Sequence, residues 1–232
     1  MIDIEQLRYR WPRGQRDVLA IDGLHIAAGR SVFLFGDSGC GKSTLLGLMA
    51  GVLLPQAGRV TVLGQNWQQL SASGRDGFRA DHVGHIFQQF NLLPYLSVLD
   101  NVLLPCRFSK RRAQQAVEAC GSATQQAATL LTHMGLPQAM WQQRASELSV
   151  GQQQRVAAGR ALMGQPELVI ADEPTSALDA ARRDSFMQLL RGLCREQRTT
   201  LVFVSHDERL AEGFDQTISL PELNRASSGV LA

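Results

Sequence analysis

The sequence predicts an α/β fold with a mainly parallel sheet. Three continuous apolar runs, SVFLF (31–35), ELVIAD (167–172) and TLVFVS (200–205), have the pattern of strands buried on both faces. Between the last two, apolar residues at 186, 189, 190 and 193 fall at the i, i+3, i+4, i+7 spacing of a helix that packs on a sheet. Strands that alternate with helices imply crossover connections, and therefore parallel strands.

The other elements follow from local patterns. KSTLLGLMA (42–50) is a helix that ends at Gly51, and another helix should follow Ser149 and end near Gly164. Helical composition marks 109–134, and shorter strands are expected at 2–8, 21–26, 59–63 and 83–87.

A helical stretch from about 96 to 154 interrupts the strand–helix alternation. We interpret it as an α-helical subdomain inserted into an α/β core of about 1–95 and 155–220. The chain of 232 residues is then one domain, and residues 221–232 form a short tail without a recognisable motif.

Composition restricts the possible functions. The formal net charge is +2, with 23 Lys and Arg against 21 Asp and Glu, which argues against nucleic acid as the main partner. The four cysteines form no CxxC pair, as expected in a reducing compartment. No signal peptide and no run of about 20 apolar residues is visible, so a membrane role would need a partner protein.

A glycine-rich segment after the first apolar strand matches the phosphate-binding pattern G-x-x-x-x-G-K-[ST]. Its glycines let backbone N–H groups point at phosphate oxygens, and the following helix adds its positive end. Lys42 supplies a cation for the outer phosphates, and the Ser43 hydroxyl is a candidate Mg²⁺ ligand. The predicted ATP-binding residues of this loop are Gly36, Asp37, Ser38, Gly39, Cys40, Gly41, Lys42, Ser43 and Thr44.

Such a loop needs a second metal ligand at the end of a neighbouring strand. Asp172 ends the apolar run LVIAD and fits that requirement, so we predict that it binds the metal. Glu173 follows directly and can polarise the attacking water as a general base. The expected cofactors are ATP and Mg²⁺.

Four more segments occur in a fixed order around these residues: Phe87-Gln88, Leu148-Ser149-Val150-Gly151-Gln152, Ser176-Ala177-Leu178-Asp179 and Ser205-His206-Asp207. With the glycine-rich loop and the Asp-Glu pair, they resemble the nucleotide-binding subunit of ABC transporters over roughly residues 1–220. The resemblance implies a P-loop NTPase (RecA-like) core with an N-terminal antiparallel β region.

The resemblance also implies roles for residues at matching positions. Trp11 resembles the aromatic residue that stacks on adenine, with Tyr9 as the less favoured candidate. Gln88 resembles the glutamine that reaches the metal and senses the membrane partner. His206 resembles the histidine at the γ-phosphate, which makes Glu173, His206 and Gln88 the expected catalytic set. Ser149, Gly151 and Gln152 resemble the signature that contacts the γ-phosphate of the opposite subunit, and Asp179 resembles the acid that couples the two sites.

One position departs from the family pattern. The usual signature is LSGGQ, and this chain has LSVGQ. If residue 150 needed a left-handed backbone, the β-branched Val150 would be strained, and the ATPase would be slowed.

The predicted function is an ATP-hydrolysing subunit that forms a head-to-tail homodimer around two ATP and drives a separate membrane permease. The stretch FQQFNLLPYLSVLDNV (87–102) looks most like the lipoprotein-release and macrolide-export (LolD- and MacB-like) subfamily, which serves permeases for envelope substrates. The expected location is the cytoplasmic face of the inner membrane, with no nucleic-acid partner. The apolar segment from Gln88 to Asn101 is expected to meet the permease, unless its leucines pack inside the helical region.

Three alternatives remain open from the sequence. The first is an FtsE-like regulatory ATPase that signals through a membrane partner without transport. The second is a soluble cassette that works on nucleic acid or ribosomes, which the single cassette and the balanced charge disfavour. The third is a kinase or GTPase with a similar phosphate loop, which would not explain LSVGQ or SALD.

Overall fold

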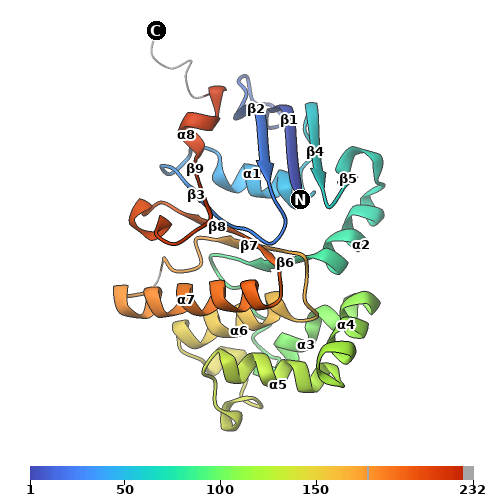
Figure 1. Cartoon of the computed structure of the whole chain (residues 1–232), viewed down its shortest axis with the longest axis vertical. Helices are drawn as coiled ribbons and strands as arrows, with labels where there is room; N and C mark the ends of the chain where they lie inside the picture. Colours follow the sequence, from blue (N-terminus) through green and yellow to red (C-terminus); the bar gives the residue numbers. More distant parts are fainter. Residues whose placement is uncertain (177, 227–232) are drawn as a thin grey trace.

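Three layers make up the molecule: an antiparallel sheet, a parallel sheet, and a layer of helices (Figure 1). The computed structural model describes residues 1–176 and 178–226. The antiparallel sheet has the strand order β2-β1-β4-β5, and the parallel sheet has the order β6-β7-β8-β3-β9. The predicted α/β fold with a mainly parallel sheet and an N-terminal antiparallel region is therefore confirmed.

The strands of the parallel sheet are the three apolar runs, the short strand expected at 83–87, and β9, which had no prediction. They are β3 (Ser31–Phe35), β6 (Val83–Ile86), β7 (Leu168–Asp172), β8 (Thr200–Ser205) and β9 (Gln216–Ser219). The antiparallel strands are β1 (Ile2–Tyr9), β2 (Leu19–Ile26), β4 (Ala57–Val62) and the short β5 (Gln65–Asn66).

The parallel sheet is buried on both faces because its residues alternate between two hydrophobic clusters. Phe33, Val169 and Phe203 join the cluster formed with the helical layer. Their neighbours Val32 and Ile170 join the cluster shared with the antiparallel sheet and α1. This double burial explains why these strands are apolar without interruption.

The helices divide between the two faces. Helix α1 (Lys42–Met49) contributes Leu45, Leu48 and Met49 to the cluster with the antiparallel sheet. The opposite layer contains α3 (Val98–Phe108), α4 (Lys110–Cys120), α5 (Ala123–His133), α6 (Val150–Leu162) and α7 (Ala180–Glu196). Helix α2 (Ala72–His82) precedes β6, and α8 (Leu220–Leu223) follows β9. Of the helices that the structure describes, none combines the length and the hydropathy that a membrane span requires.

Most expected elements are present, with differences at particular places. The helical composition at 109–134 corresponds to two helices, because Gly121 adopts a left-handed φ of 82° between α4 and α5. Helix α2 and the segment β9–α8 had no prediction, and α3 lies in the predicted helical stretch of about 96–154 without predicted bounds of its own. The residue limits of an inserted helical subdomain stay a prediction.

Candidate functional site

The glycine-rich loop leaves the carboxyl end of β3 and enters α1 at Lys42. Gly39 and Gly41 have φ values of 84° and 105°, a left-handed region that side chains disfavour. A Cβ atom on Gly41 would lie 2.8 Å from Leu19 Cδ2, so this position also has no room for a side chain. Position 41 therefore requires glycine for both conformation and space, and position 39 favours it for conformation alone.

Lys42 is held inside the loop. Its side chain is buried, and its ammonium group donates to the carbonyl oxygens of Gly36 (2.7 Å) and Asp37 (3.1 Å). Glu173 Oε1 lies 3.6 Å from the same nitrogen. A buried ammonium group in a glycine-rich loop, whose backbone N–H groups can bind an anion, is suited to polyphosphate.

Asp172 lies next to the start of α1. The Ser43 hydroxyl donates to Asp172 Oδ2 across 3.5 Å, so two of the three predicted metal ligands face each other. Burial raises the pKa of the Asp172 carboxyl, and the negative charge of Glu173 raises it further; the Ser43 hydroxyl and Lys42 act in the opposite direction. A divalent cation here would relieve that unfavourable charge.

Glu173 occupies a strained backbone position at the centre of the site. Its φ is 43°, which is unusual for a residue with a side chain, and its N–H donates to Val204 O at 3.0 Å. The carboxylate lies between two nitrogen-bearing side chains: Oε1 faces the Lys42 ammonium group, and Oε2 lies 3.3 Å from Nδ1 of His206. The imidazole of His206 is 62% exposed, so its outer side is open to a ligand.

The topology explains why these residues meet. Strands β7, β8 and β3 are neighbours and parallel, and their carboxyl ends share one edge of the sheet. Asp172 ends β7, His206 follows β8, and the phosphate loop follows β3. Gln88 is exposed two residues after the end of β6, the strand beside β7, and so belongs to the same edge. Ligands of open parallel sheets bind at such an edge.

The structure separates the two aromatic candidates for adenine stacking. The Tyr9 side chain is buried in the core, whereas Trp11 is 46% exposed in the loop between β1 and β2. Their rings meet edge to face with centroids 5.3 Å apart. Trp11 therefore offers the free ring, with Tyr9 supporting it from the core.

The signature residues lie at the start of α6, in the helical layer. Ser149 is the N-cap and forms a capping box with Gln152, whose Oε1 accepts from Ser149 N–H at 2.8 Å. Gly151 lies beside Leu178, which precedes Asp179, the N-cap of α7. Ala177 of the predicted SALD segment lies outside the described residues. Among the hydrogen bonds and ion pairs of the described residues, none joins this signature to the phosphate loop of the same chain.

The prediction of strain at Val150 is wrong. Val150 is the first residue of α6 and is absent from the residues with positive φ. Its side chain is 48% exposed. A helix N1 position takes ordinary helical angles, which a β-branched residue can adopt, so the expected slowing of the ATPase has no structural basis.

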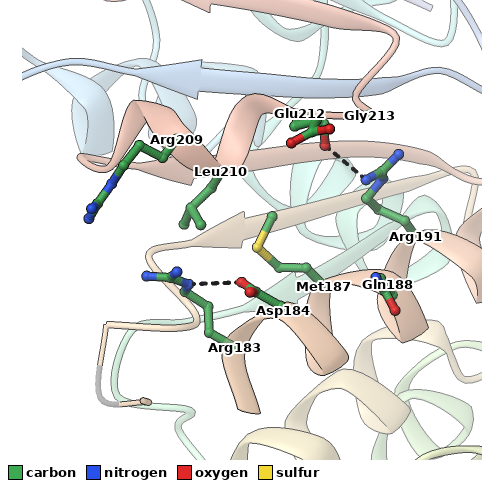
Figure 2. A pocket seen from close by; sticks show the side chains of 9 residues that line it. All are labelled: Arg183, Asp184, Met187, Gln188, Arg191, Arg209, Leu210, Glu212 and Gly213. Carbon is green, nitrogen blue, oxygen red and sulfur yellow. Dashed lines mark hydrogen bonds and ion pairs between the residues drawn. The ribbon is translucent and has the colours of Figure 1, made fainter. Parts of the chain in front are cut away.

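A hollow of about 500 Å³ lies near His206, between α7 and the 3-10 turn η4 (Glu208–Ala211). Figure 2 shows Arg183 pointing toward Asp184, and Arg191 toward the Glu212 main chain. Arg183 also reaches Asp207 at 3.3 Å, so it links α7 to the turn that follows His206. Sequence reasoning missed this link, although the quoted segment Ser205-His206-Asp207 contains one partner.

Metal binding beside the phosphate loop and Asp172 cannot depend on protein carboxylates alone. Within residues 1–176 and 178–226, no group of three or more His, Cys, Asp or Glu side chains could hold an ion. The predicted set of one carboxylate (Asp172), one hydroxyl (Ser43) and one carboxamide oxygen (Gln88) suits Mg²⁺ when phosphates and waters supply its other ligands.

Comparison with known proteins gives a consistent result. The family model described as "ABC transporter" matches residues 20–176. The uncharacterized ABC transporter ATP-binding protein YbbA of Escherichia coli K12 is 36% identical over 222 residues, which cover 95% of this chain and 94% of that protein. The lipoprotein-releasing system ATP-binding protein LolD of Syntrophotalea carbinolica is 37% identical, with 96% and 95% covered.

Two further similarities concern domain arrangement and fold. The macrolide export ATP-binding/permease protein MacB of Rhodopirellula baltica is 35% identical, and the match covers 96% of this chain and 32% of that protein. Among solved structures, the ATP-binding cassette MJ0796, a dimer in a post-hydrolysis state bound to ADP and Pi, superposes with a TM-score of 0.82 at 33% identity. That match covers 98% of this chain and 95% of the other.

Proposed function

The chain belongs to the ABC transporter family and is an ATP-binding, ATP-hydrolysing cassette, and we propose that it powers a separate membrane permease for an envelope substrate. The observation that carries the proposal is the charge arrangement at the sheet edge. One carboxylate, Glu173, lies between the cation of the phosphate loop and the exposed imidazole of His206. A similar cassette bound to ADP and Pi supports hydrolysis at such a site.

In this proposal each residue has a defined task. Backbone N–H groups of 36–44 hold the phosphates, and Trp11 stacks on adenine. Lys42 turns from the Gly36 and Asp37 carbonyls toward the outer phosphates, which leaves Glu173 free to take a proton from the attacking water. His206 and Gln88 hold the terminal phosphate and water in line. Ser43, Asp172 and Gln88 would hold Mg²⁺, which would neutralise the charge on the phosphates.

The proposal requires two copies of the chain. The phosphate loop continues into α1 on one face of the parallel sheet, and the signature begins α6 on the other face. The signature N–H groups therefore serve a triphosphate that is bound to a second copy, arranged head to tail. The related cassette MJ0796 is a dimer in two solved structures. Because only the triphosphate spans both surfaces, hydrolysis releases the dimer and supplies the mechanical step.

The permease is proposed to dock beside Gln88. An apolar hollow of about 440 Å³ has Phe87, Leu104, Pro105 and Phe108 among its lining residues. Phe108 is 78% exposed, and Tyr95 in the same region is 69% exposed. Leu92, Leu93 and Leu96 are only half-buried, so the segment 88–101 is partly packed and partly available. Large exposed apolar side chains of this kind favour a protein partner, which would place the cassette on the cytoplasmic face of the inner membrane.

One experiment separates the parts of the proposal. Wild-type protein should release phosphate from Mg-ATP, and Phe108→Ser should keep that basal rate while losing association with a co-expressed permease in detergent. Val117→Ser is the matched control, because Val117 is also an exposed apolar residue (51%) but does not line the hollow. Normal permease association of Phe108→Ser would overturn the docking surface, and no phosphate release by the wild type would overturn the ATPase.

A further inference from the structure

The last described segment of the chain lies against the phosphate loop. Strands β3 and β9 are parallel neighbours in which Phe35 pairs with Ser219, so the residues that follow each strand emerge side by side. Gly36 continues from β3, and α8 continues from β9. A Cβ atom on Gly36 would lie 2.9 Å from Pro221 Cδ. The first glycine of the phosphate loop therefore packs directly against Pro221.

Asn224, at the end of α8, binds main-chain groups at the start of β2. Its Oδ1 accepts from Ala20 N–H at 2.8 Å, and its Nδ2 donates to Val18 O at 2.9 Å. Asn224 is 1% exposed, although polar side chains are seldom buried to this degree. Strand β2 lies at the edge of the antiparallel sheet. The carboxamide thus satisfies edge groups there as a neighbouring strand would.

The backbone that Asn224 holds is in contact with the other end of the phosphate loop. A Cβ atom on Gly41 would lie 2.8 Å from Leu19 Cδ2 and 3.6 Å from Val18 Cγ1. Val18 also closes the loop that carries Trp11, since its N–H donates to Tyr9 O at 2.8 Å. Residues 18–20 therefore connect the phosphate loop to the exposed aromatic ring.

We propose that Asn224 is a positioning residue for nucleotide binding. Through two hydrogen bonds it fixes residues 18–20, and these fix Gly41 and the loop that presents Trp11. Pro221 fixes the opposite end of the phosphate loop at Gly36. The inference rests on the nucleotide site proposed above and adds to it a second support, built from residues near the carboxyl end of the described chain.

The test compares ATP affinity with turnover. In Asn224→Ala, residues 18–20 lose both side-chain bonds and populate other arrangements, so we expect the Kd for fluorescent MANT-ATP to rise roughly tenfold, in proportion to the lost competent fraction. Bound ATP restores the arrangement, so kcat at saturating ATP should change by less than about twofold. An unchanged Kd, or a fall in kcat with an unchanged KM, would overturn the positioning role.

Gln126→Ala is the matched control. Gln126 is also a buried amide (2% exposed) that accepts a hydrogen bond from a backbone N–H, that of Gly164, at 2.8 Å. It lies in α5 on the other face of the parallel sheet. This variant should lose thermal stability without a change in the Kd for MANT-ATP. If Gln126→Ala weakened MANT-ATP binding as much as Asn224→Ala does, the effect of Asn224 would be general destabilisation.

Wild-type protein provides a second measurement that does not depend on a substitution. If the Asn224 contacts favour nucleotide binding, bound nucleotide must favour those contacts by the same factor. ATP should therefore slow hydrogen–deuterium exchange in peptides covering 18–20 and in those covering 220–224. Slower exchange at 36–44 alone would overturn the role of Asn224 and leave the nucleotide site intact, whereas no ATP effect anywhere would overturn both.

Discussion

Two regions of this molecule carry the predicted functional residues, and they are built in opposite ways. The sheet edge holds a buried cation, a carboxylate with a raised pKa, and a glutamate with φ of 43°. The signature at the start of α6 is relaxed: Ser149 and Gln152 cap each other, and Val150 has ordinary backbone angles. The edge therefore has an unfavourable charge that a bound ligand can relieve. The signature needs no ligand for its own stability and can bind the ligand of another copy.

This contrast suggests that, in the proposed dimer, each composite site takes its catalytic groups from one copy and its signature contacts from the other. Strained, partly uncompensated groups gather at catalytic sites because the surrounding fold holds them in place. A capped helix start needs no ligand for stability but still presents free N–H groups and a positive end. We expect changes at the edge to affect chemistry and nucleotide affinity, and changes at the signature to affect only steps that need the second copy.

The largest expected effect is on turnover at the edge. Glu173→Gln keeps the size of the side chain but cannot accept the proton of the attacking water, so kcat should fall about 1,000-fold. ATP should then remain bound, and size-exclusion chromatography with light scattering should show an ATP-dependent dimer. Glu196→Gln, an exposed change at the end of α7, is the control. Normal hydrolysis by Glu173→Gln would remove Glu173 as the base.

The second-largest effect is expected from removal of the buried Lys42 ammonium group, and it concerns ATP affinity. Lys42→Ala deletes the ammonium group that contacts Gly36 O, Asp37 O and Glu173, and the Kd for MANT-ATP should rise about 100-fold, as for truncation of one buried charge partner. Lys110→Ala, at the exposed start of α4, should leave the Kd unchanged. ATP binding by Lys42→Ala that equals the wild type would contradict the phosphate role.

The signature should respond differently. Ser149→Ala removes the cap of α6, at a cost of about 1 kcal/mol in stability, but MANT-ATP binding to the isolated chain should not change. Phosphate release should fall roughly tenfold, because without the cap the signature N–H groups no longer hold the position from which they contact the partner's transition state. Ser71→Ala removes an equivalent cap, that of α2, and should leave phosphate release intact. Equal loss of activity in both variants would mean that only helix stability had been measured.

The raised pKa of Asp172 allows a smaller test. Its charged form is disfavoured by burial and by Glu173, so at neutral pH and without Mg²⁺ the ionised carboxyl lowers stability. Asp172→Asn should therefore raise Tm by roughly 1–3 °C in EDTA at pH 7. That gain should disappear as the pH falls through the raised pKa, because wild-type Asp172 is then protonated in the folded protein. A lower Tm for Asp172→Asn at pH 7 would show that the carboxylate stabilises the free protein.

The smallest effect is expected at Val150. Because this residue has ordinary helical angles, Val150→Gly should change kcat by less than about twofold while it lowers stability by about 0.5 kcal/mol through helix propensity. A severalfold rise in the rate of phosphate release would restore the idea that valine limits this signature.

The sequence predicted the edge better than the features around it. Apolar runs revealed the strands. The phosphate-loop pattern predicted one site for Lys42, Asp172 and Glu173, and the family resemblance added His206; the structure brings these residues together. Helix α2 escaped prediction because none of its residues is fully buried, and it has no apolar stripe. Helix α3 contains a proline at 105, a residue that usually signals the end of a helix.

Other features depend on contacts between residues far apart in the chain. Asn224 looks like an ordinary tail residue in the sequence, but folding brings its side chain to Ala20, which lies 204 positions earlier in the chain. The Arg183–Asp207 pair likewise joins a helix to a turn that no local pattern connects. The prediction of strain at Val150 considered only the β-branched side chain. The backbone angles of Val150 are set by its place as the first residue of α6, directly after the cap Ser149.

The central claim is that the edge of one copy and the signature of another enclose the same terminal phosphate. A cryo-EM or crystal structure of Glu173→Gln with ATP tests it most directly. We expect a two-fold dimer in which the Ser149 and Gly151 main-chain groups of each copy contact the γ-phosphate held by Lys42 of the other. A dimer in which these signature residues face solvent, away from any neighbouring triphosphate, would contradict the account.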